Sequence, residues 1–68
     1  MPVLKVLELM SESNESWEDA AQQAVSKASQ TLKGIRSVWI KDFSATVTED
    51  GKVETFRVTC KVSFEVEG

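Results

Sequence analysis

Histidine is absent from the 68-residue sequence, and cysteine occurs once, as Cys60. One thiol without an imidazole cannot supply the ligands of a zinc site, and an internal disulfide is impossible. The sequence also has no glycine-rich phosphate loop, no histidine that could activate a nucleophile, and no pair of carboxylates at a spacing typical of catalysis. These absences exclude the common catalytic centres, so we expect a protein that is not an enzyme and has no metal site of the zinc type.

The excess of one sign of charge over the other is small, and long apolar runs are scarce as well. Eight basic and eleven acidic side chains give a net charge of −3, without the basic stripe that indicates nucleic-acid binding. No apolar run approaches the roughly 18 residues that span a membrane, and the first residues lack the regions of a signal peptide. We therefore expect a cytoplasmic protein with neither nucleic acid nor a membrane as its partner.

The clearest pattern that is present is an almost unbroken alternation of apolar and polar residues from Val53 to Val66. This period of two predicts a strand with one buried face, made by Phe56, Val58, Cys60, Val62, Phe64 and Val66. Cys60 is expected to be a small buried hydrophobe of that face. A strand of this length spans about 46 Å.

One helix is predicted over residues 15–33, with either Ser13 or Ser16 as its N-cap and Gly34 following its C-terminus. Its apolar residues recur with helical period and are Trp17, Ala20, Ala21, Ala24, Val25, Ala28 and Leu32. Trp17 is expected in the core. The helix would reach only about 28 Å, so it cannot cover the long strand, and other copies of the chain are expected to cover the remainder.

Two further strands complete the prediction. Val3–Met10 is an apolar first strand, followed by a polar turn over 11–16, and Ile35–Thr48 is a second long strand. The apolar residues of Ile35–Thr48 change face near Lys41, which indicates a bend, a bulge, or a strand that passes from one covering partner to another. Asp50-Gly51 predicts a hairpin turn within 48–52. The fold class is thus α+β: residues 1–68 form a single β-α-β-β domain, whose three-stranded antiparallel sheet partly wraps one helix.

Several segments resemble the dodecin family. They are Val-Leu-Glu-Leu at 6–9, the helix start Ser-Glu-Ser-Asn-Glu-Ser-Trp-Glu-Asp-Ala-Ala at 11–21, Thr31-Leu32, Phe56-Arg57-Val58 and Lys61-Val62-Ser63-Phe64. The resemblance covers nearly the whole chain. It implies β-α-β-β subunits, a homo-oligomer of twelve such subunits and a hollow shell, in agreement with the expected self-association.

The resemblance also implies a flavin ligand: FMN, riboflavin or FAD. Flavin-binding dodecins stack the ring on a tryptophan early in the second strand, and a glutamine of the third strand binds its polar edge. These positions fall on Ser37 and Arg57 here. Trp39 lies two residues beyond Ser37 on the same face, about 7 Å further along the strand. Trp39 is therefore a candidate platform, and Arg57 a candidate donor to ring carbonyls or to a phosphate.

Other interpretations of the same residues stay open. An aromatic side chain in a strand more often serves packing or a subunit interface, which is the other interpretation of Trp39. Arg57 on a polar face more often forms a solvated or inter-subunit ion pair. Ser16-Trp17-Glu18 and Ile35-Arg36 resemble a second group of dodecins, which is associated with calcium or with no known ligand. Candidate carboxylates are Glu12, Glu15, Glu18, Asp19, Glu49 and Asp50, although none belongs to a loop of the EF-hand kind. The sequence thus favours a flavin-sequestering shell, with a shell of structural, calcium-linked or other ligand-binding role as the alternative.

Overall fold

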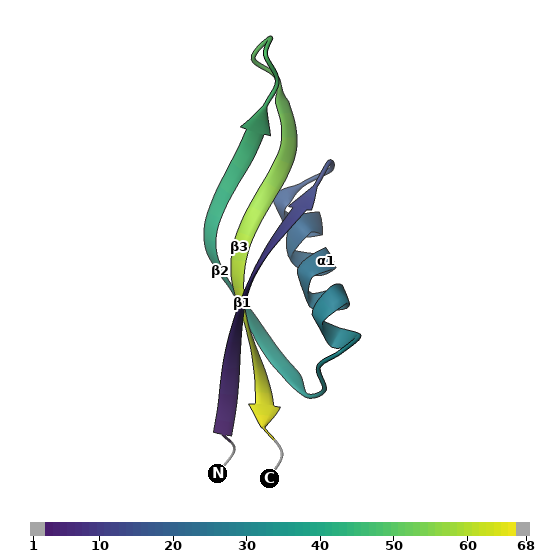
Figure 1. Cartoon of the computed structure of the whole chain (residues 1–68), viewed down its shortest axis with the longest axis vertical. Coiled ribbons are helices and arrows are strands. Elements are labelled where there is room, and N and C mark those ends of the chain that lie inside the picture. The colour runs from purple at the N-terminus through teal and green to yellow at the C-terminus, as the bar shows by residue number, and fades with distance from the viewer. Residues whose placement is uncertain (1–2, 67–68) are drawn as a thin grey trace.

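The computed structural model describes residues 3–66, which form three strands and one helix. The elements are β1 (Val3–Ser13), α1 (Trp17–Ser29), β2 (Ile35–Val47) and β3 (Val53–Val66). β3 lies in the middle of the sheet and pairs antiparallel with both neighbours, in the order β1-β3-β2. α1 lies on one side of this sheet (Figure 1). The predicted α+β class and the β-α-β-β order are confirmed. No helix within the described part of the chain is long and apolar enough to cross a bilayer.

The sheet has two distinct faces, because side chains alternate along each strand. We call the face that carries α1 the helix face and the opposite one the open face. On the helix face, Val58, Cys60 and Val62 of β3 are completely buried. Ala24 packs against Cys60 and Val62, together with the partly buried Leu9, Ile35 and Ile40. The predicted burial of Cys60 is confirmed.

Small residues let α1 lie close to β3. Ala20, Ala24 and Ala28 recur at successive helical turns and are all buried. The helix begins as expected after Ser16, whose hydroxyl accepts a hydrogen bond from the Asp19 amide at 2.9 Å. It ends earlier than predicted, at Ser29, and beyond this residue the amides of Thr31 and Leu32 both donate to the Ala28 carbonyl.

Burial should make Cys60 chemically inert in the folded protein. The surrounding apolar side chains raise the pKa of its thiol by desolvation, which disfavours the reactive thiolate. We expect Ellman's reagent to modify native Cys60 at least about a hundredfold more slowly than the chain unfolded in guanidinium chloride, since the thiol must wait for the fold to open. Equal rates under the two conditions would show that the β3–α1 contact does not protect the thiol.

Besides the helix end, three sequence-based boundaries or placements were wrong. β1 continues through the expected polar turn to Ser13, because Ser11, Glu12 and Ser13 pair with β3. Gly34 is not the glycine that ends the helix; it has a φ of 75° and opens β2, and its carbonyl accepts a hydrogen bond from the Glu65 amide at 3.0 Å. Finally, Trp17 is no core residue.

Trp17 is the first residue of α1 and precedes the row of buried alanines. It keeps 36% of its surface exposed. Its ring meets Phe56 and Phe43 edge-on, with centroid distances of 4.9 and 6.0 Å. Its Nε1 donates a hydrogen bond to the Ser44 carbonyl at 2.9 Å. The ring therefore fixes the helix start against the β2–β3 hairpin without being enclosed.

An irregularity in β2 explains the change of face near Lys41. Ile40 pairs with Cys60 and Asp42 pairs with Thr59, so one extra residue lies between consecutive positions of β3. Ile40 and Phe43 consequently both point to the helix face, although they are three residues apart. The predicted bulge is confirmed, and Trp39 and Phe43 lie on opposite faces of the sheet.

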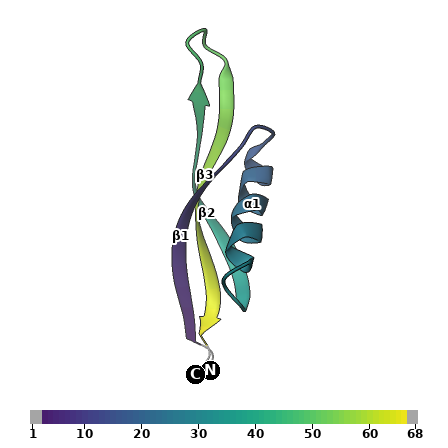
Figure 2. The same ribbon diagram turned by 45° about the vertical axis from the view of Figure 1, so that its right-hand side comes forward.

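The β2–β3 hairpin extends far past the end of the helix, as both views of the ribbon show (Figures 1 and 2). α1 has 13 residues and β3 has 14, which correspond to lengths of about 20 and 46 Å. The molecule measures 52 × 19 × 14 Å, and its radius of gyration is 14.0 Å. A compact chain of this length would have a radius of gyration of about 11 Å. The predicted shortage of helical cover is confirmed.

Candidate functional site

The open face of β2 brings Ser37 and Trp39 next to each other. Ser37 pairs with Ser63 of β3, and their hydroxyls are hydrogen-bonded to each other. Trp39 pairs with Lys61, and its side chain remains 67% exposed. The indole therefore contributes little to the packing of its own chain and presents a large flat surface that a planar ligand could stack on.

Lys61 is the close neighbour of this indole that sequence reasoning missed. Its Nζ lies 5.4 Å from the centroid of the Trp39 ring, in the geometry of a cation–π contact. The pairing of Trp39 with Lys61 depends on the register between β2 and β3, in which two irregularities lie between the hairpin turn and this pair. The sequence places Lys61 on the polar face of β3 but does not show that Trp39 lies opposite it.

Cross-strand ion pairs occupy much of the remaining open face. Arg57 Nε donates to Glu12 Oε1 on β1, and Lys41 Nζ lies 3.7 Å from Glu8 Oε1. Arg36, at another irregularity of β2, pairs with Glu65. Its hydrogen bond to Glu65, followed by the charge of that carboxylate, raises the pKa of the guanidinium. These exposed pairs contribute little to stability but leave the basic groups concerned partly neutralised.

Arg57 lies apart from the other two candidate site residues within one chain. It pairs with Ser44 on one side and with Glu12 on the other. Lys61, which is opposite Trp39, is four residues further along β3, and this spacing corresponds to about 13 Å. A single chain thus brings Ser37 and Trp39 together, with Lys61 above the indole, and places Arg57 further along the same face.

The candidate calcium ligands are spread over the molecule. Among residues 3–66, no group of three or more acidic, cysteine or histidine side chains comes together in a way that could hold a metal ion. Asp19 Oδ2 accepts hydrogen bonds from Ser13 Oγ and Gln23 Nε2, both at 2.6 Å. Asp50 accepts a hydrogen bond from Thr48 in the hairpin turn, and Glu12 pairs with Arg57. These contacts account for three of the six carboxylates within one chain.

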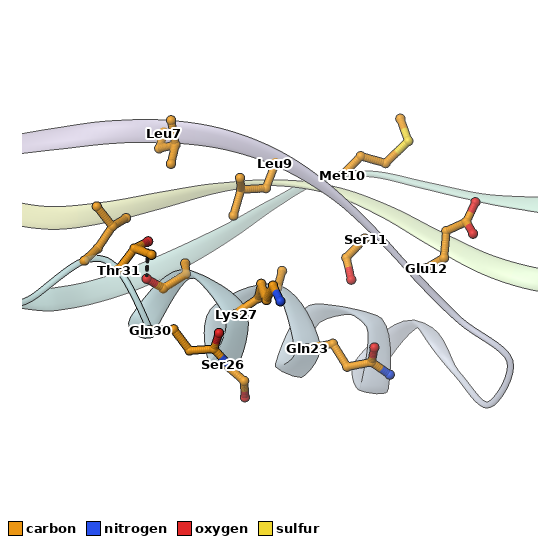
Figure 3. A pocket seen from close by; sticks show the side chains of 13 residues that line it. Leu7, Leu9, Met10, Ser11, Glu12, Gln23, Ser26, Lys27, Gln30 and Thr31 are labelled. Carbon is orange, nitrogen blue, oxygen red and sulfur yellow. Dashed lines mark hydrogen bonds between the residues drawn. The ribbon is translucent and has the colours of Figure 1, made fainter.

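A groove of about 920 Å³ separates β1 from α1. Leu7, Leu9 and Leu32 give it an apolar floor, while Gln23 and Lys27 supply polar groups from the helix (Figure 3). Met10 and Glu12 lie on its strand side and point away from the helix (Figure 3). The groove follows the unpaired edge of β1 and is broad and open, so it resembles an uncovered edge more than an enclosed ligand cavity.

Comparison with known proteins gives consistent matches over the whole chain. The Dodecin family profile matches residues 3–67. The calcium dodecin of Mycobacterium tuberculosis is 35% identical over 66 residues, which cover 97% of this chain and 92% of that protein. The crystal structure of this calcium-chelating antigen covers 96% of this chain and 91% of its own, with a TM-score of 0.83 and 34% identity. A Thermus thermophilus dodecin variant covers all of both chains with a TM-score of 0.92 and 32% identity.

Proposed function

Because the chain belongs to the dodecin family, we propose that it is a non-catalytic, homo-oligomeric shell protein that binds and sequesters flavin. The observation that carries this proposal is the exposed Trp39 indole on the open face, directly beside Ser37. An isoalloxazine ring stacked there and enclosed by neighbouring subunits would have its excited state quenched, which limits its photochemistry. Any redox chemistry would belong to the flavin and not to these side chains.

The shape of the single chain supports self-assembly. Its accessible surface is 5123 Å², whereas a compact monomer of this mass exposes about 4,300 Å². Large apolar side chains remain exposed on both faces and on the hairpin; they include Val3, Leu4, Val6, Leu7, Met10, Phe43, Val47 and Val53. Neighbouring copies that cover these side chains and the β1–α1 groove would complete the core. The number of twelve copies rests on the family likeness.

The proposed platform is displaced from the usual one of flavin-binding dodecins. Loss of an indole at position 37 removes about 1–3 kcal/mol of stacking energy per ring contact. Trp39, on the same face and about 7 Å further along the strand, would recover part of this energy. We therefore expect affinity for flavin in the micromolar range. Arg57 would donate to the ring or the phosphate only where neighbouring subunits bring it close to the flavin.

Trp39→Ala is expected to abolish most of the quenching that the protein exerts on flavin fluorescence. The reason is that the variant loses the stacking surface while the buried residues of the helix face stay unchanged. Trp17→Phe is the matched control, since it alters the other tryptophan but keeps an aromatic ring against Phe43 and Phe56. The measurement is a titration of riboflavin and FMN with each purified variant.

The titration separates a wrong assignment of the flavin site from an absence of flavin binding. Unchanged quenching in Trp39→Ala would place the flavin elsewhere on the molecule. If the wild-type protein quenches neither flavin at high concentration, flavin binding is contradicted altogether. The alternative of a shell with a structural, calcium-linked or other ligand-binding role would then remain.

Calcium is the second candidate ligand, favoured by the similarity to the calcium dodecin. Since the acidic side chains of residues 3–66 do not converge within one chain, such a site would need oxygen ligands from more than one copy. Calorimetric titration of the assembled, chelator-treated protein with Ca²⁺ tests this alternative. Heat that saturates at a fixed ratio of calcium to subunits would support it, and heat of dilution alone would contradict it.

A further inference from the structure

The contact between Lys61 and Trp39 determines which flavin the proposed site accepts. The Lys61 ammonium lies over one face of the indole, 5.4 Å from the ring centroid, in the place of a ring that stacks on that face. A planar ligand can use this face only if the ammonium moves aside. The Lys61 side chain is long and flexible, and a cation–π contact at an exposed ring is weak, so this movement is easy.

Lys61 differs from the other basic residues of the open face. Arg36, Lys41 and Arg57 each pair with a carboxylate. Within residues 3–66, Lys61 has no carboxylate at ion-pair distance; its cross-strand neighbour Glu8 pairs with Lys41 instead. A ligand that displaces the ammonium from the indole therefore leaves it without a partner, unless the ligand itself carries an anion.

From this geometry we infer that the Trp39 site selects flat ligands with an anionic tail, so that a flavin phosphate ester binds in preference to the neutral flavin. This inference rests on the proposed flavin binding. The phosphate of FMN would accept charge-assisted hydrogen bonds from the displaced Lys61 ammonium, while the ring stacks on the indole. Riboflavin offers the same ring but must displace Lys61 without a replacement partner.

The test compares the affinities of FMN and riboflavin in matched variants, by fluorescence titration at low and at high ionic strength. We expect the wild-type protein to prefer FMN by about fivefold at low salt, and less at high salt, because the phosphate contact is exposed and screened. Lys61→Met should bring the two affinities to within about twofold by weakening FMN, while Lys61→Arg should keep the preference. Lys52→Met, in the hairpin turn, makes the same change of charge far from Trp39 and should leave the preference intact.

Failure of the inference and failure of the proposed function give different results. If both flavins bind with equal affinity to the wild type, or if Lys61→Met keeps the full preference, the role of Lys61 is overturned while flavin binding stands. If Lys52→Met lowers the preference as much as Lys61→Met, the net charge of the protein is responsible and the inference is also overturned. If no variant binds either flavin, the proposed function falls and the inference falls with it.

Discussion

Ser37→Trp is expected to strengthen flavin binding about five- to 150-fold, which is the gain from about 1–3 kcal/mol of stacking. Position 37 has room for an indole because Ser37 is exposed and its hydroxyl bonds only to that of Ser63. The new ring would lie beside Trp39 and enlarge one continuous aromatic surface on the open face. Loss of the exposed serine pair should cost less than about 0.5 kcal/mol.

The matched control for this gain is Ser44→Trp. Ser44 is another exposed serine of β2 on the open face, opposite Arg57 and away from Trp39. Fluorescence titration with FMN should show a large increase for Ser37→Trp and little change for Ser44→Trp. An equal increase in both variants would mean that any added indole attracts flavin, and an unchanged affinity in Ser37→Trp would exclude this part of β2 from the site.

Phe43→Asp is expected to convert the assembled protein into small or unfolded species. Phe43 is 63% exposed in the single chain and lies on the helix face, where α1 gives way to the projecting hairpin (Figure 1). If neighbouring copies cover it, each subunit loses about 2 kcal/mol or more of apolar burial and also gains a buried charge. Because every subunit of a homo-oligomer carries the change, the effect multiplies across the assembly.

Size-exclusion chromatography with light scattering measures this outcome directly. Gln22→Glu serves as the control, since it adds the same negative charge on the exposed side of α1 and suits a helix. The control should elute with the wild type. A Phe43→Asp protein that also keeps the full mass of the wild-type assembly would show that the hairpin arm is not part of the interface. A compact wild-type monomer at high concentration would contradict self-assembly as a whole.

Local patterns predicted most of the fold. The alternation from Val53 to Val66 gave the bounds of β3 and its buried face, because that strand pairs on both sides and so shows the full period of two. The errors arose where tertiary contacts override local preference. Ser11 to Ser13 have the composition of a turn, but their backbone groups extend the ladder with β3. Trp17 fits the helical stripe, yet its position at the start of the helix leaves 36% of its surface exposed.

The candidate site was predictable only in part, for a geometric reason. Ser37 and Trp39 are two residues apart in one strand, so their common face follows from the sequence alone. Lys61 meets Trp39 only because of the β2–β3 register, and two irregularities lie between the hairpin turn and this pair, one extra residue on β3 and one on β2. The carboxylates considered for calcium likewise follow no local spacing, and whether copies bring them together is a property of the assembly and not of the chain.

The extra residue between Ile40 and Asp42 has a consequence for how this segment tolerates mutation. It determines which face of the sheet each later residue of β2 points to, since Phe43 points toward the helix only because one position is skipped. Inserting or deleting a single residue here would exchange the two surfaces downstream, turning Phe43 outward and Ser44 inward. Residues 40–43 should therefore accept changes of side-chain type far more readily than any change in their number.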